Sequence, residues 1–170
     1  KLERHFYSTS SCGICGKASI ELIEQQCSVS IPTSFSINNI FIKKIISSLQ
    51  SDQLIFKHTG GLHATALFSQ NTKLTMVKED VGRHNAFDKA IGQSLANNKM
   101  PLFKNVILVS GRLSFELVQK AAMAGVPVIC AIGAPSSLAI ETADKFNITL
   151  IGFLKEMRYN IYSHPNRVIP

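Results

Sequence analysis

Tryptophan is absent from this 170-residue sequence, and aromatic side chains make up only 8% of it. Proteins that bind single-stranded nucleic acid usually interleave aromatic residues with basic ones, and no basic run of that kind occurs here. The longest apolar run covers only residues 126–132, whereas a membrane-spanning helix needs roughly 20 apolar residues. We therefore expect neither a nucleic-acid partner nor a membrane partner.

Cysteine is also scarce: of the four cysteines, only Cys12 and Cys15 are close in sequence. This pattern argues against a disulfide framework, and it leaves no second pair of ligands for a complete zinc site. The polar amino terminus does not resemble a signal peptide, which favours a cytoplasmic location. The chain does not start with Met, which suggests a fragment that lacks the N-terminal portion of a longer protein. Neither a G-x-G-x-x-G nor a P-loop motif is found.

What remains is the composition of a globular domain with a basic surface. Hydrophobic residues make up 45% of the chain, enough to bury a core. There are 18 Lys and Arg against 11 Asp and Glu, a formal net charge of +7. This charge indicates an anionic partner, for which a small phosphate-bearing ligand is suitable; an ordinary solvated basic surface is the alternative.

Helical and strand-like segments alternate along most of the chain. Apolar spacing predicts helices at residues 36–50, 83–97, 114–124 and 136–146. Alternating and β-branched runs predict strands at 62–69, 73–78, 106–109, 126–132 and 148–153. This order indicates an α/β domain over residues 31–170, with a mostly parallel sheet covered on both faces and one antiparallel hairpin near its start. Residues 1–30 show little periodicity and are expected to form a loop segment that carries cysteines.

Polar segments that contain glycine lie at the joints between these strands and helices. They cover residues 57–63, 79–85, 110–112 and 133–136. In α/β sheets, ligands collect where strands end and helices begin, because free backbone N–H groups and the positive end of the helix dipole lie there. We therefore expect these four segments to form one composite site.

The segment Cys12-Gly-Ile-Cys15-Gly16 allows four interpretations. As half of a zinc site it lacks the other two ligands. A thioredoxin-like dithiol requires a strand that leads into a helix at the first cysteine, and too few residues precede Cys12 for that. Two buried cysteines would not need a glycine after each. A mobile nucleophilic thiol that accepts sulfane sulfur, with a second thiol to resolve or relay it, fits the flanking glycines.

Residues 79–89 concentrate ionisable groups where a strand becomes a helix. Arg83 and His84 can bind phosphate beside free backbone N–H groups, with Asp80 or Asp88 supporting them. An ordinary helix cap with an ion pair is the alternative.

His58 and His63 flank Gly60 and Gly61, two residues that permit close approach of a ligand or a strand. His63 is either a site residue or a buried core histidine. Arg112 is a further candidate for binding an anion, because an arginine that begins a covered helix is costly unless it is paired.

Together these motifs resemble the formate dehydrogenase accessory sulfurtransferase family, FdhD. The resemblance covers nearly the whole chain, and several ordered motifs are more specific than any one of them. The matching segments are Ser10-Ser-Cys-Gly-Ile-Cys-Gly-Lys17, His58-Thr-Gly-Gly-Leu-His-Ala64, Glu79-Asp-Val-Gly-Arg-His-Asn-Ala86 with Asp88-Lys89, Ser110-Gly-Arg112, Ala134-Pro135, Leu150-Ile-Gly-Phe153 and Asn160-Ile-Tyr162.

The resemblance implies a sulfur carrier required for formate dehydrogenase activity, and thus a sulfurtransferase. A cysteine desulfurase would load a persulfide onto Cys12, with Cys15 as its partner. The sulfur would then pass to the molybdenum bis(molybdopterin guanine dinucleotide) cofactor, a bound substrate, before its insertion into formate dehydrogenase. The family's cofactor-binding stretch would correspond to Phe153, Leu154, Lys155, Glu156, Met157 and Arg158. We assign to the same groove His58, Gly60, Gly61, His63, Arg83, His84 and Arg112.

The resemblance also implies a three-layer α/β/α fold with a mixed sheet, similar to that of cytidine deaminases, which hold zinc at the starts of two helices. Here His84 and Asn85 would occupy the first position, and residues 111–114, which contain no cysteine, the second. We therefore expect no structural metal and an anion-binding surface in which Arg83 and Arg112 supply the positive charge. A cofactor-binding chaperone without sulfur transfer and a zinc-dependent deaminase are the alternatives. A homodimer would suit a large two-sided cofactor.

Overall fold

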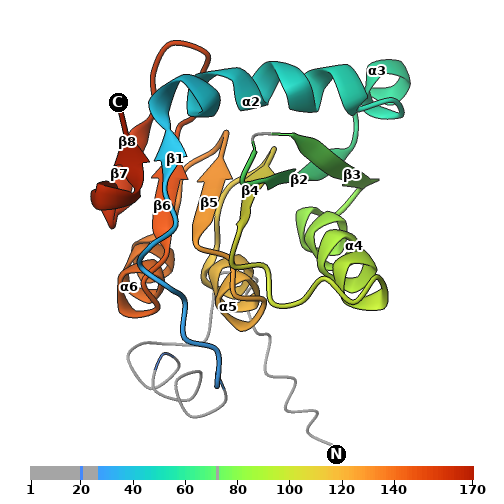
Figure 1. Ribbon diagram of the computed structural model, residues 1–170. Coiled ribbons are helices and arrows are strands. Elements are labelled where there is room, and N and C mark those ends of the chain that lie inside the picture. The colour runs from blue at the N-terminus through green and yellow to red at the C-terminus, as the bar shows by residue number, and fades with distance from the viewer. Residues whose placement is uncertain (1–19, 21–26, 72) are drawn as a thin grey trace, which may run out of the picture.

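A computed structural model describes residues 20, 27–71 and 73–170 of the chain. A central sheet has the strand order β3-β2-β4-β5-β6-β7 (Figure 1). Its strands are β2 (His63–Ser69), β3 (Leu74–Asp80), β4 (Asn105–Val109), β5 (Val128–Ala131), β6 (Thr149–Gly152) and β7 (Asn160–Ser163). The longer helices are α2 (Asn39–Asp52), α4 (Arg83–Ala96), α5 (Phe115–Met123) and α6 (Ser137–Lys145). No helix in the described ranges is both long enough and apolar enough to cross a membrane.

The sheet is the middle layer of three. Helix α2 covers one face, and α4, α5 and α6 cover the other (Figure 1). Alternate residues of each strand supply the two cores: Leu108 and Cys130 pack with α2, whereas Ile107 and Ile129 pack with α5. This is the period-two pattern of a sheet that is buried on both faces. The three-layer α/β/α architecture with a mixed sheet, which the family resemblance implied, is confirmed.

The direction of several strands differs from the sequence prediction. Only the β4–β5 and β5–β6 pairs are parallel among the described strands of this sheet; β2–β3, β2–β4 and β6–β7 are antiparallel. The prediction of a mostly parallel sheet was therefore wrong, whereas the predicted antiparallel hairpin near its start, β2–β3, is confirmed. The β3–α4–β4 crossover makes β3 and β4 run in the same direction. Strand β2 lies between them and runs in the opposite direction, so both of its pairings are antiparallel. The sheet also ends in β7, a short edge strand that is antiparallel to β6 and that the sequence did not predict.

The first long helix begins later than the sequence predicted. Residues Ile37–Asn38 form β1, which pairs in parallel with β8 (Val168–Ile169) at the end of the chain. The side chain of Asn38 then caps α2, because its Oδ1 accepts a hydrogen bond from the Ile40 N–H at 2.6 Å. The short helix α3 (Phe56–Thr59) and the 3-10 turn η1 (Pro165–Arg167) were also not predicted. The other predicted helices and strands are confirmed to within a few residues at their ends.

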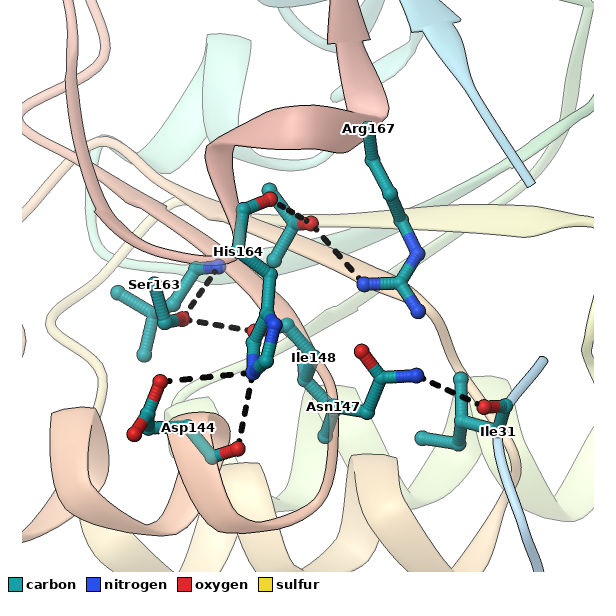
Figure 2. A network of polar contacts seen from close by, with 9 residues as sticks. Ile31, Asp144, Asn147, Ile148, Ser163, His164 and Arg167 are labelled. Carbon is teal, nitrogen blue, oxygen red and sulfur yellow. Dashed lines mark hydrogen bonds and ion pairs between the residues drawn. The ribbon is translucent and has the colours of Figure 1, made fainter. Parts of the chain in front are cut away.

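A polar network fixes the C-terminal segment to the body of the domain (Figure 2). Arg167 is only 1% exposed; its Nη2 donates to the Pro32 carbonyl oxygen at 2.9 Å and its Nη1 to Thr149 Oγ1 at 3.4 Å. Burial lowers the pKa of Arg167. His164 Nε2 lies 2.8 Å from the Asp144 carbonyl oxygen, so the same segment also contacts α6. Arg167 thus joins β8, β6 and the residues that precede β1.

We expect the Arg167→Ala substitution to lower the free energy of unfolding by about 2–4 kcal/mol, because it leaves a cavity and removes the donor to two buried oxygens. Arg167→Met refills most of the volume and removes a desolvated charge, so its loss should be smaller, about 1 kcal/mol. Urea unfolding measures both values, with the exposed Arg158→Ala as the control. An Arg167→Ala protein as stable as the unsubstituted chain would contradict this role.

Candidate functional site

The four polar segments of residues 57–63, 79–85, 110–112 and 133–136 lie along one edge of the sheet, which we call the polar edge. His63 at the start of β2 pairs with Asp80 at the end of β3. On the other side of β2, the Ser110 N–H donates to the Ala64 carbonyl oxygen at 2.9 Å, and Ser110 Oγ accepts from the Ala64 N–H at 2.8 Å. The topology therefore brings together segments that are far apart in the chain.

Two glycines allow the loops of the polar edge to pack against each other. A Cβ atom at Gly133 would lie 2.8 Å from the Gly111 carbonyl oxygen and 2.9 Å from the Arg112 nitrogen, both too close. The Gly133 N–H instead donates to the Gly111 oxygen at 3.1 Å. A Cβ atom at Gly111 would lie 3.3 Å from His63 Nδ1 and 3.4 Å from Arg83 Cδ. His63 and Arg83 therefore lie against the same loop.

Arg83 and Arg112 line a cavity of about 220 Å³, which we call the arginine cavity. Its remaining lining residues are Leu113, Ser114, Ala134, Pro135 and Ser136. Three helices begin here, since Arg83 is the first residue of α4 and Ser114 and Ser136 are the N-cap residues of α5 and α6. Helix amino ends and arginine side chains both favour an anion such as phosphate. The buried Arg83 Nε has no hydrogen-bond partner within the described part of the chain, so a donor is left for a ligand.

His84 contributes a neutral group rather than a charge. Its Nε2 lies 3.4 Å from Ser114 Oγ, the N-cap residue of α5. Burial, and then the nearby Arg83 guanidinium, lower the pKa of His84 below its usual value. The imidazole is therefore uncharged at neutral pH, and the positive charge of the cavity comes from the two arginines.

Asp80 and Asp88 do not support Arg83 in the way that the sequence suggested. Asp80 accepts hydrogen bonds from the Gly82 N–H at 2.9 Å and from Asn85 Nδ2 at 3.1 Å, and it pairs with Lys89 at 2.6 Å. The Lys89 ammonium, followed by these two bonds, lowers the pKa of Asp80 to about 2. Asp88 pairs with Lys120 at 2.6 Å. Asp80 therefore fixes the first turn of α4, and Arg83 stays available.

A second cavity, of about 400 Å³, lies beside the first and is here called the histidine cavity. It is lined by Gln50, Gln53, Phe56, Gly60, Gly61, Leu62, His63, Ser110 and Ile132. Gly60 adopts a left-handed conformation, with φ of 65°, and ends α3. His63, Gly60 and Gly61 thus share one cavity, whereas His58 is exposed on α3 and does not line it.

Some residues of the stretch 153–158 line a cavity and the others do not. Phe153, Lys155 and Arg158 surround, with Asn160, a third cavity of about 340 Å³. Leu154 is fully buried in the core, so it cannot contact a ligand. Glu156 and Met157 are exposed and do not line the cavity. The Phe153 N–H donates to the Gly133 carbonyl oxygen at 3.1 Å, which connects this cavity to the polar edge.

Cys12 and Cys15 lie outside the described residues. Of the described cysteines, Cys27 and Cys130 are free thiols, and complete burial raises the pKa of Cys130, which makes it unreactive. Among the described residues, no three or more His, Cys, Asp or Glu side chains lie close enough together to hold a metal ion. His84 and Ser114 lie together at the starts of α4 and α5, the two helix starts that the resemblance assigned to zinc ligands.

Sequence reasoning gave no role to several polar residues of the site. Ser114 and Ser136 were the first residues of predicted helices, and the structure makes them the N-cap residues of α5 and α6. Gln53 gave no local signal, and Glu79 was predicted only as part of the polar segment 79–85, because its contact with α3 joins residues distant in sequence. Glu79 Oε2 and Oε1 accept hydrogen bonds from the Ile55 and Phe56 N–H groups at 2.9 and 2.8 Å.

A family model described as the FdhD/NarQ family matches residues 1–169. The chain belongs to this family. A sulfur carrier protein FdhD from Streptomyces coelicolor is 47% identical over 169 residues, covering 98% of this chain and 60% of that protein. One from Picrophilus torridus is 43% identical over 166 residues, covering 98% of this chain and 63% of that protein. The chain thus spans about three fifths of the length of these FdhD relatives.

Solved structures agree with the FdhD/NarQ assignment and with the fold. A formate dehydrogenase accessory protein from Desulfotalea psychrophila superposes with a TM-score of 0.74 at 29% identity, covering 80% of this chain and 60% of that one. A guanine deaminase from Nitrosomonas europaea gives a TM-score of 0.55 at 10% identity, covering 90% of this chain and 93% of that one. The second likeness concerns the fold alone and confirms the expected deaminase-like architecture.

The depressed pKa of Asp80 predicts a defined pH dependence. Because its pKa in the folded chain, about 2, lies below the ordinary value of 3.8, the ionised form stabilises the fold. That contribution should be complete above about pH 5 and should disappear as the pH falls through 4 to 2. Asp80→Asn should therefore reduce stability at pH 7 and have little effect near pH 2.

Urea unfolding between pH 2 and 7 measures this difference. Lys89→Ala serves as the second variant, because loss of the largest contribution to the pKa shift should move the titration of Asp80 toward higher pH. A difference between Asp80→Asn and the unsubstituted chain that stays constant down to pH 2 would contradict the assignment.

Proposed function

We propose that this chain acts as a sulfur carrier required for formate dehydrogenase activity. Membership of the FdhD/NarQ family and relatives named sulfur carrier protein FdhD support this proposal. The observation that carries it in the described structure is the arginine cavity, where two arginines and three helix amino ends offer a site for phosphate. Its substrate would be the molybdenum bis(molybdopterin guanine dinucleotide) cofactor, whose dinucleotide arms carry phosphates.

Loading of sulfur is assigned to Cys12. Its thiolate would attack the terminal sulfur of a persulfide on a cysteine desulfurase. The S–S bond of the donor breaks, the donor leaves as a thiolate, and Cys12 carries the sulfane sulfur, so no net oxidation occurs. Cys15 would resolve or relay this persulfide. The flanking Gly13 and Gly16 support an accessible thiol at this point of the chain.

The bound cofactor would extend over the arginine cavity and the neighbouring cavity of Phe153, Lys155 and Arg158. The Gly133–Phe153 hydrogen bond supports a continuous surface between the two. The sulfur would reach the cofactor before its insertion into formate dehydrogenase. We further propose that the protein works in the cytoplasm, an assignment that the free thiols of Cys27 and Cys130 support.

Cys12→Ala should abolish sulfur loading and leave the fold intact. The chain is incubated with a cysteine desulfurase and cysteine, and the sulfane sulfur is mapped to peptides by non-reducing mass spectrometry. Cys15→Ala should have a milder effect if this residue only resolves or relays sulfur, and Cys27→Ala is the matched control. A folded Cys12→Ala protein that is loaded to the same level as the unsubstituted chain would reject this assignment.

A cofactor-binding chaperone without sulfur transfer is the second candidate, because the arginine cavity does not depend on either cysteine. Binding of GDP, measured by calorimetry, should survive Cys12→Ala and Cys15→Ala. Arg83→Ala and Arg112→Ala should each weaken it by about 10- to 100-fold, the usual effect of losing a charge-assisted hydrogen bond. The exposed Lys104→Ala is the control. GDP binding that neither arginine substitution changes would place the phosphate site elsewhere.

A further inference from the structure

Ser114 is an N-cap residue whose hydroxyl does not cap its helix. Within the described part of the chain, its side chain accepts no capping hydrogen bond from the first turn of α5. Ser136, the corresponding residue of α6, does cap, because its Oγ accepts from the Ala139 N–H at 3.2 Å. The Ser114 Oγ instead lies 3.4 Å from His84 Nε2. Since both serines line the arginine cavity, only one of them presents a hydroxyl next to a histidine there.

His84 is placed to act as a general base toward this hydroxyl. In the tautomer that carries its proton on Nδ1, Nε2 accepts a hydrogen bond from the Ser114 O–H. Burial, and then the Arg83 guanidinium, hold the pKa of His84 below its ordinary value, so the imidazole can take up a proton at neutral pH. Contacts between a nucleophile and its base are often this long before a substrate binds.

Glu116, in the first turn of α5, acts on the same imidazole. Its Oε2 is buried and has no hydrogen-bond partner among the described residues. Against the effect of burial, its charge raises the pKa of His84; Asp88 acts in the same direction, whereas Arg83 and Lys120 act in the opposite one. A carboxylate beside the base stabilises the imidazolium that forms when the proton of the serine is taken.

The arginine cavity supplies the rest of a substrate site. The first N–H groups of α5 have no acceptor within the helix, so they can stabilise the negative charge that develops on a carbonyl oxygen under attack. Arg83 and Arg112 line the same cavity, and their charge favours a substrate with a carboxylate or phosphate group. The volume of about 220 Å³ restricts the reacting part of that substrate to a small group.

We infer that Ser114, His84 and Glu116 form a hydrolytic site for small carboxylic esters that carry a negative charge. Ser114 Oγ bonds to the ester carbonyl carbon while His84 Nε2 takes its proton. The C–O bond of the ester then breaks, His84 gives the proton to the leaving alcohol, and the acyl group stays on Ser114. Water attacks this acyl group, and His84 takes a proton from the water and returns it to Ser114 as the acid leaves. Glu116 is a positioning residue. This activity goes beyond the proposed sulfur transfer and uses neither Cys12 nor Cys15.

Diisopropyl fluorophosphate tests the nucleophile on the unsubstituted chain. Its phosphorus should bond to Ser114 Oγ with loss of fluoride, and peptide mass spectrometry should find the adduct there. Ser136 should stay unlabelled, because it lines the same cavity but its oxygen caps α6. His84→Ala should slow the labelling about 100-fold or more, the usual effect of losing a general base. Absence of an adduct on Ser114, or equal labelling of both serines, would overturn the inference.

Hydrolysis of mono-p-nitrophenyl succinate, an anionic ester, is compared with that of p-nitrophenyl acetate, a neutral one. Ser114→Ala should lower kcat/KM about 100-fold or more, and Ser47→Ala, an exposed serine of α2, is the control. Arg112→Ala should reduce the preference for the anionic ester about tenfold, since a charge-assisted contact is lost. Hydrolysis that survives Ser114→Ala would overturn the inference.

The pH profile separates the role of Glu116 from a merely structural one. The kcat/KM for the succinate ester should rise with pH as His84 loses its proton, with a midpoint below the ordinary histidine value of 6.5. Glu116→Gln should move this midpoint to lower pH, because the carboxylate that raises the pKa of His84 is gone. An unmoved midpoint would remove Glu116 from the site. Sulfur loading of Cys12 on the unsubstituted chain tests the carrier function separately.

Discussion

The close contact between the loops that follow β4 and β5 is the constraint on which the polar edge depends. Parallel strands end at the same edge of a sheet, but their loops can meet only if no side chain separates them. Gly111 and Gly133 meet this condition, and a Cβ atom at Gly133 would collide with the backbone of the neighbouring loop. The 110–112 loop consequently lies between two cavities, with Ser110 lining one and Arg112 lining the other.

This arrangement separates charge from neutral hydrogen-bonding groups over a short distance. The arginine cavity collects two guanidinium groups and the amino ends of three helices, while burial and Arg83 keep His84 uncharged. The histidine cavity instead offers a carboxamide, a hydroxyl and apolar surface. The two cavities therefore differ in the charge that they offer to a ligand.

The sequence predicted the long helices and the central strands because each has a regular apolar period. It did not predict β7, whose four residues have too little apolar alternation to be recognised, or α3, a single turn. It predicted the antiparallel pairing of β2 with β3 but not that of β2 with β4. The direction of a strand leaves no trace in its own residues, since the alternation of side chains is the same for parallel and antiparallel neighbours.

In the candidate site, too, some features could be predicted from the sequence and others could not. The sequence by itself determined which residues stand at the ends of strands, among them His63, Arg83 and Arg112, because turn residues and periodicity mark those ends. Only the tertiary structure decided that Gln53 lines the histidine cavity, that Glu79 holds α3 and that Asp80 pairs with Lys89 rather than supporting Arg83. These outcomes depend on contacts between segments that become neighbours only when the sheet assembles, and local sequence patterns contain no information about them.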